Sequence, residues 1–592
     1  MLETYYRMLN PTETIQRAMP AITEAFVTFY GEENREFIEQ KFRDILIIGY
    51  SSPATVKRIL NDMKKIKSDE LIKSFLEEVG VEVSSPEAKM YIDTSYLDNT
   101  YSIPIHFYSS FLNGELPAYQ MSKVVEFLKN FYPEVTLDNL QELENQDHFR
   151  EIKEKVRKYD SIRSHYLAFL DTIKDYEDYV SKYDSYLRDL KDKYDLEFVE
   201  TFKEFIPEEE LEKIRKAKNV VRNAFYYTPY LSTLKSWDLK GNALIDAFDE
   251  EQEAILHSDQ EWRVKIVKKD RIEYFKKCGI DHGDNYEEYM DDPECQRKIP
   301  SLDFIKMVRE KRLELYTRMG NEFYLSTEDY KKNRKRIEES GCLVDKDYFD
   351  ANAFENNATF IADNLVNRNG EYSIFALLCI NMGGIAENLD ADIIHELNHV
   401  LELHLVGVNG NEYQTICGWD TAEGKIKSGV SSNEKVNLEN RKDKRGYELF
   451  NEIVNELIAQ EIATILQNSG NYIFNPPGTG KIRGRTGYES TRYLITDFFN
   501  EYKDSIIASR RHGNIEKIKN AVGNQNFEDF NSLFHVHNET LSGFEFYNMY
   551  EDMQAKRDTN RTRVFHSLVN KRDEILKSIQ VYQQQVSANT MV

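Results

Sequence analysis

Three histidines and two glutamates lie within one short apolar stretch, LDADIIHELNHVLELHLVG, at residues 389–407. Its H-E-x-x-H pattern places His395 and His399 four residues apart, on one face of a helix, where both imidazoles can bind a single metal ion. Glu396 lies beside that ion and can act as a base toward its water. The alternative is a helix with two incidentally spaced histidines, but the apolar back of the stretch favours a metal site.

Two elements are expected to position these side chains. Apolar residues at three- and four-residue intervals predict a helix that begins near Asp390 or Asp392 and ends at Gly407. Before it, EYSIFALLCINMGG at residues 371–384 is typical of a buried strand that ends in a glycine turn. The pattern therefore predicts a strand followed by the histidine-bearing helix.

This strand, turn and H-E-x-x-H helix resemble the zincin metallopeptidases, over residues 350–500. In those enzymes an edge strand runs alongside the substrate just before the helix. Zinc needs a third protein ligand, and the metzincin branch takes a histidine six residues after the second one. Here that position is Leu405, and His404 is one residue away from it. We expect His404 to point away from the metal, as a packing or surface residue.

The gluzincin branch takes its third ligand from a later helix. The segment YELFNEIVNELIAQEIATIL, at residues 447–466, has a strongly apolar helical face that would make two carboxylates costly unless they bind a partner. The resemblance implies that Glu452 is the ligand and that Glu456 orients a ligand histidine. An alternative ligand is Glu423, 24 residues after His399, a spacing found in the thimet-oligopeptidase family.

A tyrosine often completes a gluzincin site by donating a hydrogen bond to the oxyanion. The neurotoxin light chains use an R-x-x-Y pair, and Arg485 and Tyr488 have that spacing. The resemblance therefore implies Tyr488 as a catalytic residue, with Tyr447 as its competitor. A packing role for Tyr488 stays open.

The segment NPPGTGK, at residues 475–481, resembles a nucleotide-binding loop only superficially. Asn475 replaces the first glycine, and Ile482 replaces the hydroxyl residue that would bind Mg²⁺. A loop between helices is expected, and no nucleotide cofactor.

The 592 residues are too many for one core, and two domains are predicted. Residues 1–340 are expected to form a helical domain that walls the substrate cleft or recruits a partner, and residues 341–592 a zincin-like α+β catalytic domain with a small sheet. The fold class is therefore mainly α. Within the first domain, residues 90–112 favour a β-hairpin and residues 140–225 an antiparallel helical pair.

The net charge and the cysteine content limit the kinds of partner that the protein is expected to bind. A net charge of -25 disfavours nucleic acid and anionic lipid, so neither nucleic acid nor membrane is expected as a partner. The N-terminal residues lack the features of a signal peptide, and the apolar runs are too short to span a bilayer, so a cytoplasmic location is predicted, with signal-less export left open. The five cysteines have no C-x-x-C spacing, and residues 1–340 contain no evident cluster of metal ligands.

These observations predict a zinc metallopeptidase of gluzincin type, with one zinc per chain and a peptide or protein substrate. Glu396 would act as the general base and Tyr488 would stabilise the oxyanion. One alternative is an inactive scaffold that keeps a structural zinc, although the intact Glu396 counts against it. A second is a helical interaction protein without metal. Substrate identity and oligomeric state are left open.

Overall fold

The computed structural model describes most of the chain. The described residues are 2–43, 45–91, 104–144, 149–204, 254–277, 279–298, 302–328, 358–368, 371–382, 389–410, 412–426, 438–444, 446–476, 489–511, 513–541 and 553–590, with a few isolated positions between them. Helices dominate these residues, and two small sheets accompany them. The predicted mainly α class with a small sheet is confirmed.

The chain forms two compact units. Unit 1 comprises Met1–Asn10 and Ser51–Tyr186, and unit 2 comprises Pro11–Tyr50 and Leu187–Val592. Residues 11–50 therefore belong to the same unit as the H-E-x-x-H helix. The predicted boundary near residue 340 falls in residues 332–357, outside the described residues, and it stays a prediction.

Unit 1 is helical. Its elements are α1 (Leu2–Leu9), α4 (Pro53–Glu78), α5 (Ala88–Tyr91), α6 (Pro104–Leu112), the 3-10 turn η2 (Ala118–Gln120), α7 (Met121–Leu128), α8 (Leu140–Glu144) and the first part of α9 (Phe149–Phe202). The start of α4 is specified by its sequence, because Pro53 occupies the first helical position and the Ser52 hydroxyl accepts a hydrogen bond from the Thr55 amide at 3.2 Å.

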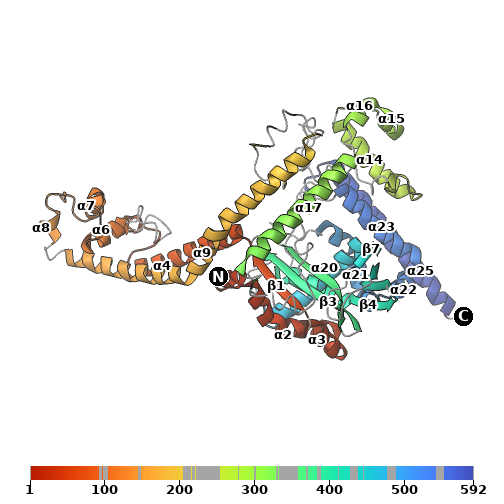
Figure 1. Ribbon diagram of the computed structural model, residues 1–592, viewed down its shortest axis with the longest axis horizontal. Helices are drawn as coiled ribbons and strands as arrows, with labels where there is room; N and C mark the ends of the chain where they lie inside the picture. Colours follow the sequence, from red (N-terminus) through yellow and green to blue (C-terminus); the bar gives the residue numbers. More distant parts are fainter. Residues whose placement is uncertain are drawn as a thin grey trace. The chain divides into compact units, whose positions relative to one another are not determined.

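Residues 140–225 were predicted to form two helices that pack antiparallel against each other, and this prediction is wrong. Residues 149–202 contain neither glycine nor proline, and they form one continuous helix, α9 (Figure 1). Its antiparallel neighbour is α4: Lys64 lies 2.7 Å from Glu177, and Lys158 donates to the carbonyl of Glu78 at 3.4 Å.

The predicted hairpin at residues 90–112 is also wrong where the structure describes it. Residues 104–112 form α6, which begins at Pro104, a residue favoured in the first helical turn. Ile105 and Tyr108, three residues apart, are both fully buried, so the apolar pattern there follows a helix.

Unit 2 contains the site and most of the remaining elements. Its helices are α2 (Pro11–Tyr30), the turn η1 (Glu32–Asn34), α3 (Arg35–Arg43), the end of α9, α14 (Glu261–Lys277), α15 (Tyr286–Asp291), α16 (Pro293–Lys298), α17 (Leu302–Ser326), α19 (Leu389–Glu402), α20 (Glu448–Asn468), α21 (Glu489–Arg510), α22 (Ile515–Val522), α23 (Asn524–Leu541) and α25 (Asn560–Thr590).

Two sheets lie in unit 2. The first has the order β1-β3-β2, from β1 (Leu46–Ser51), β3 (Glu371–Met382) and β2 (Ala358–Arg368), and β2 pairs antiparallel with β3 (Figure 1). The second is the antiparallel meander of β4 (Leu403–Asn409), β5 (Glu412–Cys417), β6 (Asp420–Ile426) and β7 (Leu438–Lys444). The predicted strand at residues 371–384 is confirmed as β3, but it is central, and the strand beside α19 is the edge strand β2.

The predicted H-E-x-x-H helix is confirmed as α19, but it ends earlier than expected. It stops at Glu402 rather than Gly407, because Leu403 already begins β4 and pairs with Cys417. The later carboxylate-bearing helix is confirmed as α20. These two helices pack against each other, and α2 packs on α20.

Candidate metal centre

The packing of α19 on α20 brings the three predicted metal ligands together. Nε2 of His395 lies 3.0 Å from one carboxylate oxygen of Glu452, and Nε2 of His399 lies 3.2 Å from the other. The two Nε2 atoms are 3.1 Å apart. Three side chains from two helices therefore bring their donor atoms together at one point.

This geometry suits a zinc ion. Tetrahedral zinc with bonds of about 2.0–2.1 Å to nitrogen and oxygen separates its ligand atoms by about 3.3 Å. The observed separations of 3.0–3.2 Å are close to that value. Two imidazole nitrogens and one carboxylate are also a donor set that zinc prefers.

Each histidine has a second partner on the far side of its ring. Nδ1 of His395 lies 3.3 Å from a carboxylate oxygen of Glu456, which is only 4% exposed. Nδ1 of His399 lies 3.7 Å from the sulfur of Cys417, on β5. A proton on each Nδ1 leaves each Nε2 lone pair for a metal. Glu456 thus lies where the gluzincin resemblance predicts.

The electrostatics of the cluster, without an ion, show how strongly these groups interact. Burial lowers the pKa of His395, but hydrogen bonds to Glu452 and Glu456 outweigh burial and raise that pKa to about 9. Burial raises the pKa of Glu452, yet His399 and His395 hold it well below its usual range. The carboxylate is therefore ionised and available as a ligand.

Glu396 is the residue next to the first ligand and takes no part in the converging group. Burial raises its pKa to about 7, against the opposing effect of His395 and His399. A carboxyl with a pKa near neutrality can both accept and return a proton at neutral pH, which general acid–base catalysis requires.

A buried polar network holds the back of α19. Asn398 is 0% exposed and donates to Oδ1 of Asn455, on α20, at 2.6 Å. Asn455 in turn donates to the carbonyl of His395 at 2.8 Å. The hydroxyl of Tyr30, from α2, donates to Oδ1 of Asn398 at 2.5 Å. The N-terminal segment therefore supports the helix that carries both histidines.

A second network fixes the start of α20. Arg510, which is 0% exposed, donates to the two carboxylate oxygens of Glu402 at 2.9 and 2.5 Å. It also donates to the carbonyl and the side-chain oxygen of Asn451, at 2.9 and 2.7 Å. Because Asn451 precedes Glu452, this bidentate ion pair connects the end of α19 to the backbone that presents the third ligand.

Gly418, in the turn between β5 and β6, completes this second network. Its φ of 60° lies in the left-handed region, and a Cβ there would come 2.7 Å from Oδ1 of Asn451. The turn can therefore approach Asn451 only because the residue is glycine. The backbone amide of the next residue, Trp419, donates to the same Oδ1 at 3.1 Å.

Asp390 anchors the first turn of α19. It is 3% exposed, and its carboxylate accepts hydrogen bonds from the backbone amides of Ile473, Phe474 and Asn475 at 2.7–3.1 Å. Those residues follow α20, so Asp390 joins the N-terminal end of one ligand helix to the segment after the other. Asp390, which was predicted to lie at the start of the helix, thus also makes a tertiary contact.

His404 and Tyr447 both lie among the described residues, and each has partners outside the converging group. His404 lies on β4, where Nε2 contacts the carbonyl of Arg511 at 2.8 Å, so it has the packing role expected of it. The hydroxyl of Tyr447 donates to Glu528 at 2.7 Å and accepts from Lys519 at 3.2 Å. Arg485, Tyr488 and most of residues 475–481 lie outside the described residues.

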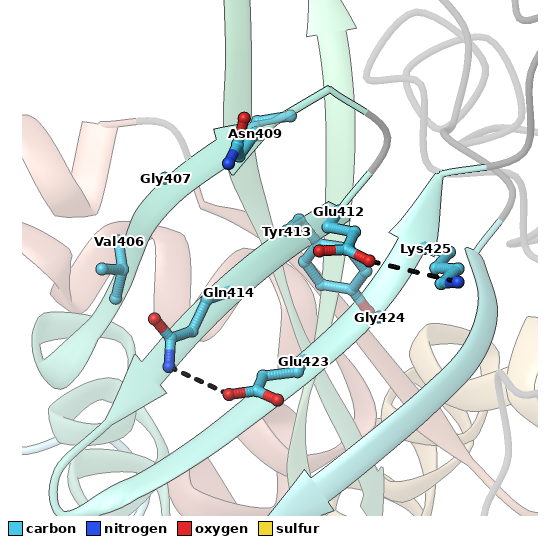
Figure 2. Close-up of a pocket in the computed structure, with 10 residues that line it drawn as sticks. Val406, Gly407, Asn409, Glu412, Tyr413, Gln414, Glu423, Gly424 and Lys425 are labelled. Atoms are coloured by element: carbon cyan, nitrogen blue, oxygen red, sulfur yellow. Dashed lines mark hydrogen bonds and ion pairs between the residues drawn. The ribbon is translucent and has the colours of Figure 1, made fainter.

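The alternative ligand Glu423 lies on β6, and its side chain lines a hollow that does not contain His395, His399 or Glu452 among its lining residues. Its carboxylate accepts a 3.3 Å hydrogen bond from Gln414 on β5, and both residues line a hollow of about 760 Å³ over β4, β5 and β6 (Figure 2). Gly407, opposite Gln414 in the register, leaves this face open. Glu423 is not part of the converging group.

Residues 1–340 were expected to bind no zinc, because their sequence shows no evident cluster of metal ligands, and this stays a prediction. The structure does bring together His282, Asp292 and Cys295, a group of side chains that could hold a metal ion. The spacing of these residues follows no common zinc pattern, so only the folded loop reveals them.

Several supporting residues were not anticipated from the sequence: Tyr30, Asn398, Glu402, Cys417, Asn455 and Arg510. A partial signal existed for the two asparagines, because each lies on an otherwise apolar helical face and is three residues from a predicted metal ligand. Tyr30 and Arg510 are remote in sequence and carried no such signal.

Comparison with known proteins gave no match: no protein-family model, curated protein or solved structure matches this chain. Among the helices of the described residues, none combines the length and the apolar character needed to cross a membrane.

Proposed function

We propose that this chain is a zinc-dependent metallopeptidase of the gluzincin type. The observation that carries the proposal is the convergence of Nε2 of His395, Nε2 of His399 and the carboxylate of Glu452 at separations of 3.0–3.2 Å. These three side chains would hold one zinc ion per chain.

The bound zinc would supply a Lewis acid that polarises a water and the scissile carbonyl. Glu396, one residue after the first ligand, takes a proton from the attacking water and returns it to the leaving amine. In the metal-free cluster, burial raises the pKa of this carboxyl to about 7. Glu456 and Cys417 lie beside the Nδ1 atoms of His395 and His399, at 3.3 and 3.7 Å, where they can orient both rings.

The substrate class follows from the zincin resemblance, which implies peptide bonds. The edge strand β2 lies against α19, and within the described residues its partner is β3 alone. An extended peptide could therefore pair with the outer edge of β2, the strand that lies against the H-E-x-x-H helix. This arrangement supports a peptide or protein substrate.

Tyr488 is proposed as the donor to the oxyanion. Tyr447, its competitor, already uses its hydroxyl with Glu528 and Lys519. That engagement favours Tyr488, on the basis of the R-x-x-Y spacing with Arg485.

An inactive scaffold that keeps a structural zinc is the alternative function. Glu396 opposes it, because a structural site has no use for a half-buried carboxyl next to its ligands. A helical protein without metal would leave three convergent donors unexplained.

Metal analysis combined with cleavage of a peptide library tests the proposal. The wild-type protein should cleave peptides in a zinc-dependent manner, and Glu452→Ala should lose both the catalytic zinc and cleavage. Glu423→Ala is the matched control, a glutamate turned toward Gln414, and it should keep both. If Glu423→Ala loses the zinc while Glu452→Ala keeps it, the ligand assignment is wrong.

A further inference from the structure

A second group of metal-binding side chains lies between α14 and α16, in a part of unit 2 that the proposed peptidase chemistry does not use. Nε2 of His282 lies 2.8 Å from a carboxylate oxygen of Asp292. The thiol of Cys295, which is 0% exposed, completes the group, and its donor atoms all lie within 4.8 Å of one another. One nitrogen, one oxygen and one sulfur donor are thus brought together.

A turn and the start of a short helix bring these donor atoms close together. Gly283 has a φ of 69°, and its amide donates to Asp281 at 2.9 Å, so the chain turns immediately after His282. The other carboxylate oxygen of Asp292 accepts from the amide of Glu294 at 2.6 Å and starts α16. Cys295 therefore lies in the first turn of that helix, beside the aspartate.

The imidazole of His282 is also held on its other side. Its Nδ1 lies 3.8 Å from a carboxylate oxygen of Glu288, whose second oxygen accepts a 2.6 Å hydrogen bond from Asn285. The ring of Tyr289 packs edge-on against the imidazole at 5.0 Å. A carboxylate behind Nδ1 leaves Nε2 facing Asp292 and Cys295, which is how histidine ligands are commonly oriented.

We propose that His282, Asp292 and Cys295 form a second zinc site, with a structural role. Zinc is favoured over calcium or magnesium because the group includes a thiol and an imidazole. Binding would deprotonate the Cys295 thiol. The metal would then be held by the sulfur of Cys295, a ring nitrogen of His282 and a carboxylate oxygen of Asp292, with water as a further ligand.

A structural role fits the elements that the site connects. The helices α15 and α16 have six residues each, too short to be stable in isolation. A metal at this point fastens the turn after His282 to the start of α16, which stabilises both short helices. The loss of this zinc should therefore loosen residues 279–298 while leaving the H-E-x-x-H centre intact.

Counting metal in the full-length chain separates the two sites. Loaded with zinc and dialysed, the wild-type protein should retain two ions per chain, the His395→Ala/His399→Ala variant one, and the His282→Ala/Cys295→Ser variant one. The His395→Ala/His399→Ala variant isolates the second site, so the proposal is overturned if that variant is folded by circular dichroism and binds no metal. If only the proposed zinc site of His395, His399 and Glu452 does not bind zinc, the wild type and the His395→Ala/His399→Ala variant should each retain one ion.

Cobalt substitution identifies the sulfur ligand. In the His395→Ala/His399→Ala background, Co²⁺ should produce a near-ultraviolet thiolate charge-transfer band. Cys295→Ser should abolish it, whereas the control Cys379→Ser, a buried thiol on β3, should retain it. If Cys295→Ser does not fold, His282→Gln decides, because the His282 side chain is 28% exposed and its substitution should cost little stability. A band that keeps its full intensity in whichever of these two variants folds contradicts the proposed ligands.

Discussion

Glu456 places a carboxylate oxygen 3.3 Å from Nδ1 of His395, on the opposite side of the imidazole from Glu452. The two carboxylates come from successive turns of α20, so a single helix carries both the proposed ligand Glu452 and the carboxylate beside the proposed ligand His395. The same relationship explains why two glutamates are tolerated on a buried helical face.

The contact of Glu456 with His395 predicts that Glu456→Ala weakens zinc binding at the proposed centre of His395, His399 and Glu452 by roughly ten- to a hundredfold, as the loss of an orienting carboxylate commonly does. A zinc titration against a competing chelator measures this change. Gln460→Ala is the control, because Gln460 donates to Glu456 at 2.8 Å and should alter affinity much less. An unchanged dissociation constant in Glu456→Ala would show that the contact has no orienting role.

Asp390 predicts a stability effect that is separate from metal ligation. Asp390→Ala leaves three buried backbone amides without their acceptor and should lower the free energy of unfolding by about 3–5 kcal/mol. Denaturant unfolding of the metal-free protein measures the loss. Glu516→Ala, an exposed acidic residue in the first turn of α22, is the matched control and should change it by less than about 0.5 kcal/mol. Equal stability of the two variants would contradict the anchoring role.

His537 predicts a pH dependence of stability. It is 5% exposed, lies 2.8 Å from the hydroxyl of Ser490, and burial lowers its pKa to about 3, against about 6.5 in the unfolded chain. Above pH 6.5 neither state is protonated at this position; below it only the unfolded chain takes up the proton, so stability falls as the pH falls from about 6.5 toward 3. The loss at pH 5 should be about 2 kcal/mol.

Unfolding midpoints measured between pH 7 and pH 5 test this effect. His537→Gln removes the titrating group, so its stability should change less over that range than that of the wild type, whatever its stability at pH 7. His535→Gln, at a half-buried histidine two residues away on α23, should retain the wild-type slope. Parallel slopes for the wild type and His537→Gln would exclude a buried neutral imidazole.

The oxyanion donor is tested by kinetics. Tyr488→Phe should lower turnover by about a hundredfold or more, because a hydroxyl that binds the oxyanion acts mainly in the transition state, and it should leave the Michaelis constant and zinc content nearly unchanged. Tyr447→Phe should have little effect, since that hydroxyl is bound to Glu528 and Lys519. The opposite ranking of the two variants would assign the role to Tyr447.

The sequence predicted those features that depend on local spacing. The helix of His395 and His399 and the helix of Glu452 follow from apolar periodicity, and α20 brings Glu452 to the histidines because both helices bury their apolar faces against each other. The end of α19 was placed five residues late, at Gly407, because the pairing of Leu403 with Cys417 is a tertiary contact that local periodicity does not reveal.

Long-range contacts account for what was missed. Arg510 lies 108 residues from Glu402, and Tyr30 lies 368 residues from Asn398, so neither partnership has a local pattern. The group at His282, Asp292 and Cys295 depends on a loop that turns at Gly283, and its spacing alone does not indicate a metal. Alternation in residues 90–112 was misleading because the segment from Pro104 buries a helical face.

The central claim, that Glu396 is the base beside a zinc held by His395, His399 and Glu452, is tested most directly by Glu396→Gln. Glutamine has nearly the same shape but cannot accept the proton, so the variant should bind zinc at the peptidase centre as tightly as the wild type. Its cleavage of a peptide that the wild type cuts should fall to background. Zinc content and cleavage are measured on the same two preparations. Retained zinc with lost cleavage is the predicted result, and full activity in Glu396→Gln would contradict the account.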